Sequence, residues 1–297
     1  MKKKGLTQDR IVYIINYVIL FLFALLVLYP IIYVTSCSFS SGEALLGGKV
    51  RLLPVDFTFE GYKMVFGYKS IWVGYKNTVI YTLIGVILSV AMTLLAAYPL
   101  SRDDFRGKKY ITILFIFTMM FSGGMIPSYL LIKNLNLLDS MWAVILPGCV
   151  SAYNVVVART FFNQSIPKEL LEAAEMDGCS DFTFFAKIVI PLSKAIIAVM
   201  SLWCAMPLWN GYFNAMIYLN SDSKQTLQLA LRRILLMSQV DLTNVGTIDL
   251  DVIAKNQYLS EMLKYGTIVL STLPLMLVYP LIQKYFAKGV MIGSVKG

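Results

Sequence analysis

The run IVYIINYVILFLFALLVLYPIIYV, residues 11–34, carries no charged side chain. A helix of about 20 apolar residues is long enough to cross a hydrocarbon core about 30 Å thick. Four basic residues precede this run, as they would in a signal peptide. However, the apolar part of a signal peptide is only about 7–15 residues long. We therefore expect residues 11–35 to form an uncleaved first transmembrane helix. The sequence VTSC at 34–37 is interpreted as its end rather than as a lipoprotein cleavage site.

Five further apolar segments follow along the chain. Charged residues make up only 14% of the 297 residues, against about 25% in a soluble domain. Within lipid, a segment must satisfy its own backbone hydrogen bonds, and a helix does so. The sequence therefore predicts an all-α integral membrane protein with six transmembrane helices in one domain, residues 1–297. The expected spans, none of which contains Asp or Glu, are residues 11–35, 77–100, 110–132, 142–162, 194–219 and 266–287.

The short basic connectors set the predicted orientation. Four Lys or Arg crowd residues 102–109, and the N-terminal segment is also basic. Because Lys and Arg are enriched in cytoplasmic loops, we expect this connector and both termini in the cytoplasm, and the connector 133–141 outside. Residues 36–76 and 220–265 would then be outer loops. The net charge of +9 is spread over such connectors, which favours anionic lipid headgroups over nucleic acid as its partner.

Several kinds of chemistry are absent from the sequence. There is no histidine, and the four cysteines, Cys37, Cys149, Cys179 and Cys204, lack metal-ligand spacing. No G-x-x-x-x-G-K-[ST] phosphate loop is present, and no span holds an acidic residue that could relay protons or bind sodium. We therefore predict no catalytic residue, no metal site and no cofactor in this chain. The energy for uphill transport would have to come from another chain.

Between the fourth and fifth spans lies a polar loop, residues 163–192, which includes SIPKELLEAAEMDG. Pro167 fits the first turn of a helix, and the glutamates that follow suit the positive end of its dipole. Gly178 supplies a left-handed stop, and a second short helix can start at Ser180 or Asp181. The pattern predicts a helix–turn–helix on the cytoplasmic surface. Helix signals alone do not decide between a solvated surface helix and a docking surface for another protein.

The spacing within this loop resembles a known motif. Glu172-Ala173-Ala174, followed by Gly178, Ile188 and Pro191, resembles the EAA loop of ABC importer permeases, although Ile190 stands where that family commonly has Leu. The resemblance implies the type I importer permease fold, in which this loop forms a cytoplasmic coupling helix that docks into an ATPase. ATP and Mg²⁺ would then belong to two copies of a partner subunit. The positions it assigns to ATPase coupling are Glu172, Ala173, Ala174, Asp177, Gly178, Ile188 and Pro191.

The resemblance covers nearly the whole chain. Trp209-Asn210 and the tail KGVMIGSVKG, residues 288–297, resemble the carbohydrate-uptake branch, the maltose-type permeases. FSGGMIP at 121–127 is closer to the subgroup associated with oligosaccharides and polysaccharide fragments. The resemblance implies a permease in the plasma or inner membrane that translocates a sugar or oligosaccharide delivered by an external solute-binding protein. It also implies a heterodimer with a second permease, and a second contact with the ATPase through the tail.

Polar and aromatic residues in two spans are candidates for the substrate path. In the fifth span, Trp203, Pro207, Asn210 and Asn214 fall roughly on one helical face. Asn can bond sugar hydroxyls and an aromatic ring can stack on a sugar, but such groups also join helices or mark the membrane interface. The lack of a fixed cation deep within the spans favours a neutral, hydroxyl-rich solute. The candidates are Tyr153, Asn154, Trp209, Asn210, Tyr212 and Asn214.

Other classes stay open at this point. An ABC permease for a non-sugar solute, such as an amino acid or peptide, would share the loop and the spans. An ion-coupled secondary transporter would need an intramembrane acid or a repeated, broken-helix architecture, and neither is visible in the sequence. No nucleophile–base arrangement of a membrane-bound enzyme stands out either.

Overall fold

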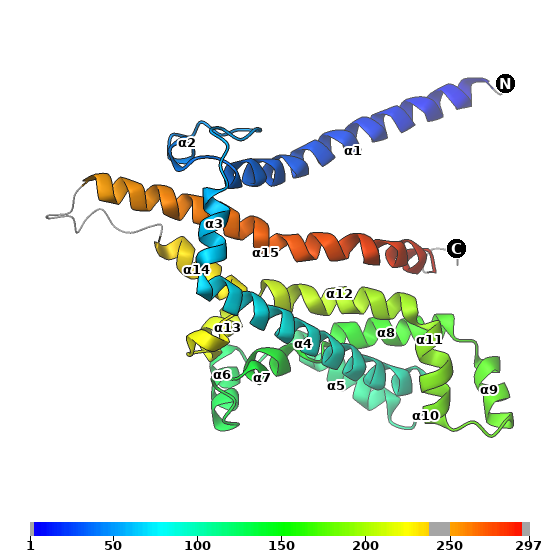
Figure 1. Ribbon diagram of the computed structural model, residues 1–297. Coiled ribbons are helices and arrows are strands. Elements are labelled where there is room, and N and C mark those ends of the chain that lie inside the picture. Colours follow the sequence, from blue (N-terminus) through cyan, green and yellow to red (C-terminus); the bar gives the residue numbers. More distant parts are fainter. Residues whose placement is uncertain (1–2, 238–249, 293–297) are drawn as a thin grey trace. The chain divides into compact units, whose positions relative to one another are not determined.

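Helices make up the regular secondary structure of this chain wherever it is described. The computed structural model describes residues 3–237 and 250–292. The longer helices are α1 (Lys3–Ser38), α4 (Lys69–Ser101), α5 (Lys108–Met120), α8 (Ala152–Ser165), α12 (Lys194–Asn210), α14 (Leu227–Met237) and α15 (Leu250–Ile292). The shorter ones are α2 (Gly42–Leu46), α3 (Glu60–Gly67), α6 (Met125–Asn134), α7 (Met141–Ile145), η1 (Leu146–Gly148), α9 (Lys168–Met176), α10 (Asp181–Phe184), η2 (Phe185–Val189), α11 (Ile190–Leu192), α13 (Phe213–Tyr218) and η3 (Asp222–Lys224) (Figure 1).

Three helices are long and apolar enough to cross a membrane without a break. Their spanning parts are Arg10–Ser38 in α1, Lys69–Ser101, which is α4, and Gln257–Pro280 in α15. By length and composition, the described residues therefore hold three candidate membrane spans, or up to six if each of three bent helix pairs counts as one. This range includes the predicted six spans. The bent pairs are Lys108–Met120 with Met125–Asn134 (115°), Met141–Gly148 with Ala152–Ser165 (52°), and Asp181–Leu192 with Lys194–Asn210 (80°).

The third expected span, residues 110–132, is not one straight helix. α5 ends at Met120, and Gly124 adopts a φ of +82° directly before α6 begins. A positive φ is open to glycine but strained for most other residues, so the chain turns sharply here. α5 has 13 residues, which at 1.5 Å per residue span about 20 Å, less than the hydrocarbon core of about 30 Å. The apolar run was long enough for one helix, but the glycines within it divide it.

The fourth and fifth expected spans are also divided. In residues 142–162, Pro147 lies in the short helix η1, after which the chain bends by 52° into α8. In residues 194–219, α12 ends at Asn210, and α13 is a separate helix. Pro207 lacks the N–H that would continue the hydrogen-bond ladder, and Gly211 leaves the helix with ψ 114°. The expectation of a single helical face from Trp203 to Asn214 is therefore wrong.

The segments expected to be outer loops are largely helical. Residues 36–76 contain α2, α3 and the start of α4, and residues 220–265 contain α14 and the first part of α15. The predicted spans stopped where the hydropathy fell. A helix continues past that point wherever its backbone hydrogen bonds and an amphipathic face are kept.

The described residues pack into two compact units, one of those up to Ile71 and between Leu231 and Leu273, the other of Trp72–Ala230 and those from Pro274 onward. In the first unit, the rings of Tyr33 and Tyr265 meet edge to face with centroids 6.4 Å apart. Ser38 Oγ lies 2.9 Å from Tyr62 Oη in the same unit. The expectation of a single domain over residues 1–297 stays a prediction.

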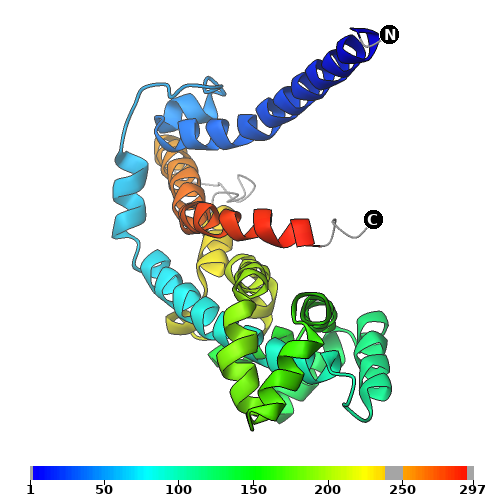
Figure 2. The same ribbon diagram turned by 90° about the vertical axis from the view of Figure 1, so that its right-hand side faces the viewer.

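The second unit has a hydrophobic core built on α4, α8 and α12. Figure 2 views α8 and α12 nearly end-on, and the two helices are in contact. The predicted loop contributes to this core as well, so it is anchored to the spans of its own chain. The buried core includes Leu94 and Ala97 of α4, Ala158 and Phe162 of α8, Met200 of α12, and Ala174, Phe184, Phe185 and Val189 of the loop.

Helix α4 is fixed near both of its ends. Near its start, Asn77 Nδ2 donates to the carbonyl oxygens of Ser223 (2.8 Å) and Gln225 (3.0 Å). Tyr81 Oη donates to the carbonyl oxygen of Lys224 at 3.0 Å. Near its end, the ring of Tyr98 packs on Phe185 with centroids 4.9 Å apart. In Figure 1, α9 and α10 lie at one end of this unit and α6 and α13 lie at the other.

A single aspartate organises the end opposite to α9. Asp139 has a φ of +54°, and its Oδ1 accepts the backbone N–H groups of Asn220 (3.0 Å) and Ser221 (2.9 Å). Its Oδ2 accepts the Ser221 hydroxyl (2.5 Å) and the Lys224 ammonium (2.9 Å). These bonds, the Ser221 hydroxyl foremost, hold the pKa of Asp139 well below its usual range. We call residues 136–141 and 218–225 the Asp139 turn.

Candidate functional site

The predicted coupling loop, residues 163–192, takes in the last residues of α8 and then forms α9, as the sequence predicts. Pro167 directly precedes the helix, and Glu169 lies in its first turn, near the positive end of the dipole. At the other end, Gly178 adopts a φ of +71°. Its N–H donates to Glu175 O (3.0 Å), and the Cys179 N–H donates to Ala174 O (2.9 Å). This pair of bonds is the Schellman motif, so the predicted glycine stop is confirmed.

The returning half of the loop starts immediately after that stop. Ser180 caps α10, and its hydroxyl accepts the N–H of Thr183 at 3.3 Å. The helix then widens into the π-turn η2, Phe185–Val189, in which the Ile190 N–H donates to Phe185 O. Pro191 follows, and the bend of 80° into α12 falls at Ser193. π-turns are rare and recur at functional sites, and this one contains the predicted coupling residue Ile188.

The two alanines of the motif face in different directions. Ala174 is only 8% exposed and belongs to the core of the second unit, whereas Ala173 is exposed. The small side chain of Ala174 thus allows α9 to lie close to its own spans, and only Ala173 is open to a partner's backbone. Glu172 and Met176 are also exposed, Met176 by 88%. These three residues are spaced at one, three and four positions, which places them on one side of α9.

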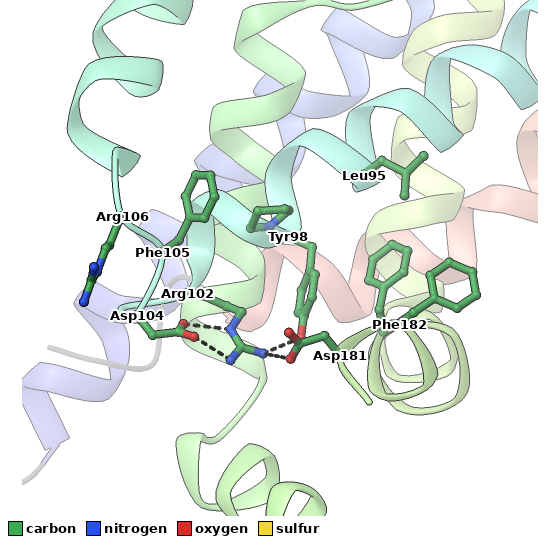
Figure 3. Close-up of a pocket in the computed structure, with 10 residues that line it drawn as sticks. Leu95, Tyr98, Arg102, Asp104, Phe105, Arg106, Asp181 and Phe182 are labelled. Carbon is green, nitrogen blue, oxygen red and sulfur yellow. Dashed lines mark hydrogen bonds and ion pairs between the residues drawn. The ribbon is translucent and has the colours of Figure 1, made fainter. Parts of the chain in front are cut away.

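A buried arginine joins both halves of the loop to the end of α4. Arg102, with only 12% of its side chain exposed, donates from Nη1 to Asp181 Oδ1 (2.6 Å) and from Nη2 to Glu175 Oε1 (3.3 Å). It also binds Asp104 with two parallel bonds of 2.8 and 2.7 Å (Figure 3). A guanidinium is suited to this role, because its planar fork binds carboxylates in pairs. The hydrogen bond with Asp104 is the main reason why the pKa of Arg102 lies above its ordinary value.

A second ion-pair centre fixes the beginning of α9. Asp103 binds the Lys168 ammonium through Oδ2 and the Lys108 ammonium through Oδ1 at 3.3 Å. The hydrogen bond from Lys168 is the main reason why the pKa of Asp103 lies below its ordinary value. The connector after α4 therefore holds α9 at both ends, Lys168 through Asp103 and Glu175 through Arg102.

Sequence reasoning used the charges of this connector only to orient the chain. Arg102 and Asp181 are 79 positions apart, so no local pattern could pair them. The sequence did contain one indication of these ion pairs. A basic connector and a loop rich in Glu and Asp were both expected on the cytoplasmic side, where their opposite charges could pair. A cavity of about 470 Å³ lies beside the Arg102 contacts, and its apolar wall includes Leu95, Phe105 and Phe182 (Figure 3).

The candidate substrate-path residues of α8 contact α12. The ring of Tyr153 lies 5.8 Å from that of Trp203, measured between centroids. Asn154 Nδ2 lies 3.7 Å from Cys204 Sγ. Tyr153 is nonetheless 54% exposed. These two residues join helices and still leave an aromatic surface free.

The remaining path candidates are separated from one another. Trp209 is buried, and its ring meets that of Tyr75 edge to face at 5.9 Å. Asn210 is exposed at the end of α12, and Tyr212 and Asn214 are exposed after the break. Trp209 therefore packs between helices, whereas the other three stay accessible. The substrate path itself stays a prediction.

The predicted tail contact cannot be placed. α15 ends at Ile292, and residues 293–297 lie outside the described residues. The tail, residues 288–297, therefore stays a prediction as well.

Comparison with known proteins supports this fold. The profile of the "Binding-protein-dependent transport system inner membrane component" matches residues 2–292. The "Polygalacturonan/rhamnogalacturonan transport system permease protein YtcP" of Bacillus subtilis (strain 168) is 40% identical over 98% of this chain and 100% of its own length. "Protein LplC" of the same organism is 38% identical over 90% of this chain and 89% of its own.

A solved structure resembles this chain just as closely. It is titled "Crystal structure of a bacterial ABC transporter involved in the import of the acidic polysaccharide alginate", and one of its chains is 40% identical. The TM-score is 0.82, and the match covers 94% of this chain and 98% of the other.

The helical fold and these similarities define a permease of an ABC importer. The chain belongs to the family of binding-protein-dependent transport system inner membrane components. The predicted membership in the carbohydrate-uptake branch is confirmed, as is the prediction of a non-catalytic, multi-pass subunit of the cell membrane. Such a component implies an ATPase, a binding protein and a partner permease. Family membership excludes the secondary transporter and the membrane enzyme.

Proposed function

We propose that this chain and a second, distinct permease form the pathway for an oligosaccharide derived from an acidic polysaccharide. The support comes from two relatives at 40% identity, one named for polygalacturonan and rhamnogalacturonan and one titled for alginate. This differs from the neutral solute expected from the spans. In a heterodimer the partner permease also lines the path, so the charge of this chain's spans does not set the substrate charge alone.

Two copies of a cytoplasmic ATPase supply the energy in this proposal, one docking on the coupling loop of each permease. The observation that carries it is the division of α9 into two faces. Ala174 is buried in the core of its own chain, while Glu172, Ala173 and Met176 are exposed. An exposed Met beside a small residue offers an adaptable apolar contact, and the glutamate adds an ion pair at its rim.

The remaining coupling residues give the docked helix its connection to the spans. Asp177 and Gly178 end α9, while Ile188 and Pro191 lie in the helix that returns to α12. Since Phe184, Phe185 and Val189 are buried in the core with α4 and α8, a displacement of α9 reaches the spans through close-packed side chains. Both termini and the connector 102–109 face the cytoplasm in this proposal.

The test is transport by the whole assembly. The chain would be purified with its partner permease, the ATPase and the binding protein, and reconstituted in lipid vesicles. ATP hydrolysis and uptake would be measured with oligogalacturonate or oligoalginate, and with an uncharged arabino-oligosaccharide as the matched control. We expect stimulation by an acidic oligosaccharide about 10-fold above the control, because a site built for a charged group rejects an analogue that lacks it.

A second candidate is import of a neutral oligosaccharide. The arabinooligosaccharides transport system permease protein AraQ of Bacillus subtilis (strain 168) is 31% identical over 92% of this chain and 92% of its own. Stimulation by the arabino-oligosaccharide alone would select this candidate. Absence of ATP-dependent uptake with any solute delivered by the binding protein would reject the transport proposal itself.

A further inference from the structure

An open groove lies at the start of α5, beside the connector and α8. Its volume is about 570 Å³. α5 belongs to a bent helix pair that is long and apolar enough to be a candidate membrane span, so we expect its first turn where this segment enters the bilayer. The residues that line the groove are Asp103, Phe105, Gly107, Lys108, Lys109, Thr112, Ile113 and Arg159.

Arg159 is an unusual cation for this position. It belongs to α8 within the expected span 142–162, and its Nε is buried without a hydrogen-bond partner. No ion pair of Arg159 occurs among the described residues. A buried cationic donor near a bilayer is costly unless an anion or a polar partner satisfies it. The chain itself supplies none where it is described, so an external anion fits.

The groove carries an excess of positive charge. Three cations line it, against the single carboxylate of Asp103, and both oxygens of that carboxylate are already bonded to Lys168 and Lys108. Lys109 is exposed and makes no ion pair with a described residue. The positive end of α5 points here too, because Gly107 precedes it without a side-chain cap. Uncapped helix N-termini bind phosphate through their free N–H groups.

The groove continues onto an apolar surface along α5. Ile113 is 52% exposed, Leu114 63% and Phe117 55%. No residue of α5 is buried within the described structure. A ligand that fits both parts has an anionic head and a hydrocarbon tail, which distinguishes a phospholipid from free phosphate.

We propose that Lys109, Arg159 and the first turn of α5 bind the headgroup phosphate of an anionic phospholipid, whose acyl chains lie along α5. The assignment of this lipid to the cytoplasmic leaflet rests on the orientation given in the proposed function. The existence of the lipid site does not depend on that orientation. Basic pockets between transmembrane helices bind anionic headgroups in this way.

The experiment measures lipid binding to the whole transporter in nanodiscs that contain phosphatidylcholine with or without phosphatidylglycerol. Bound phosphatidylglycerol would be counted by native mass spectrometry, without solute or ATP, so that a negative result does not depend on transport. We expect the apparent Kd to rise about 5-fold in Lys109→Gln and in Arg159→Gln, and about 30-fold in the double variant, since each basic residue near an anionic headgroup contributes a similar free energy.

Arg106→Gln is the matched control, because Arg106 lies in the same connector and is exposed but does not line this groove. Its Kd should stay within about 2-fold of the wild type. Lys109→Gln changes an exposed side chain and therefore keeps the test valid if Arg159→Gln does not fold.

Three results would overturn the proposal. The first is equal phosphatidylglycerol binding by the wild type and by Lys109→Gln. The second is full displacement of the lipid by inorganic phosphate, which would assign the groove to a soluble anion. The third is complete protection of Lys109 from amine labelling by the ATPase subunits in phosphatidylcholine alone, which would assign it to a protein contact.

Discussion

At one end of the second unit, the guanidinium of Arg102 collects the carboxylates of Asp104, Glu175 and Asp181. At the other end, the carboxylate of Asp139 collects two backbone N–H groups, a hydroxyl and an ammonium. In both places one charged residue joins distant parts of the chain. The partners differ in kind. Those of Arg102 are carboxylates at the tips of exposed side chains, whereas two of the four partners of Asp139 are backbone N–H groups and a third is the short side chain of Ser221.

This difference separates two kinds of joint. A backbone N–H moves only with its helix or turn, so the Asp139 turn fixes the positions of the segments that it joins. A carboxylate on a flexible side chain can keep its ion pair while the helix beneath it shifts. We infer that the Asp139 turn serves stability and that the Arg102 contacts let the coupling loop move while it stays attached.

The largest expected effect comes from stiffening the coupling loop at its glycine. At a φ of +71°, Gly178→Val introduces strain of about 1–2 kcal/mol or more and disturbs the bonds that end α9. We expect uptake to fall more than 10-fold while ATP hydrolysis persists. Uptake per ATP hydrolysed in reconstituted vesicles is the measurement.

Two variants control this result. Gly48→Val introduces the same kind of strain at a φ of +61° outside the coupling loop, where a Cβ would meet nothing within 4 Å. Gly178→Asn places at the same position a residue that tolerates the left-handed conformation, so it avoids most of the strain that valine introduces. Both should keep uptake within about 3-fold of the wild type. Equal losses in the two valine variants would attribute the effect to folding and not to coupling.

The next effect is expected at Arg102. Arg102→Ala leaves three carboxylates without their shared cation, and because these are largely exposed, the cost is about 1–2 kcal/mol. We expect uptake per ATP to fall about 5- to 10-fold and Arg102→Lys to be intermediate, since a point charge cannot bind the carboxylates as a fork.

Arg106→Ala removes a neighbouring cation that makes no ion pair with a described residue, and should change the ratio less than 2-fold, as is usual for an exposed charge (about 0–1 kcal/mol). If Arg102→Ala kept the wild-type uptake per ATP hydrolysed, the core contacts alone would transmit the movement of α9 to the spans.

The smallest effect on transport is expected at the Asp139 turn, where stability should change instead. Asp139→Asn removes the charge that the N–H groups and the ammonium stabilise, so the thermal unfolding midpoint at pH 7 should fall while uptake stays within about 2-fold. The pKa of Asp139 is lower in the folded chain than its ordinary value of 3.8. Its contribution is therefore fully present above pH 3.8 and is lost as the pH falls through the lower folded value.

The measurement is the unfolding midpoint of the detergent-solubilised protein between pH 7 and pH 3. The difference between the wild type and Asp139→Asn should be constant down to about pH 5 and should shrink below about pH 4. Asp56→Asn is the matched control, because Asp56 also has a positive φ, of 51°, but among the described residues it accepts only one long side-chain bond, of 3.5 Å from Ser41. A difference that does not depend on pH would contradict the role assigned to the Asp139 charge.

Features encoded by neighbouring residues could be predicted from the sequence. Pro167, Gly178 and Ser180 each act within one turn of their own position, and the structure begins α9, ends α9 and begins α10 where they indicate. The apolar runs likewise predicted helices of the right kind. The breaks in these helices were missed because hydropathy is averaged over a window of many residues. Gly124 and Pro147 change the course of the backbone at single positions, which such an average does not show.

Features that depend on contacts across the chain could not be predicted. Nothing adjacent to Arg102 indicates Glu175 or Asp181 as its partners. Ala173 and Ala174 are the same residue type, and only the packing of α9 on the core shows which of them faces outward. The EAA spacing identified the loop, but not which face of it is free.

The two joints are connected by α4, a single helix that has Pro99 near its far end. From Asn77 to Arg102, α4 and the residue after it extend about 37 Å at 1.5 Å per residue. Because one end of this helix is hydrogen-bonded to Ser223 and Lys224, we expect any tilt of the helix to pivot there. A tilt of about 5° about this pivot would carry the far end about 3 Å sideways, roughly the length of one hydrogen bond. A small rotation at the Asp139 turn would therefore displace Arg102 by about the length of one of its hydrogen bonds, a distance that flexible carboxylate side chains can follow.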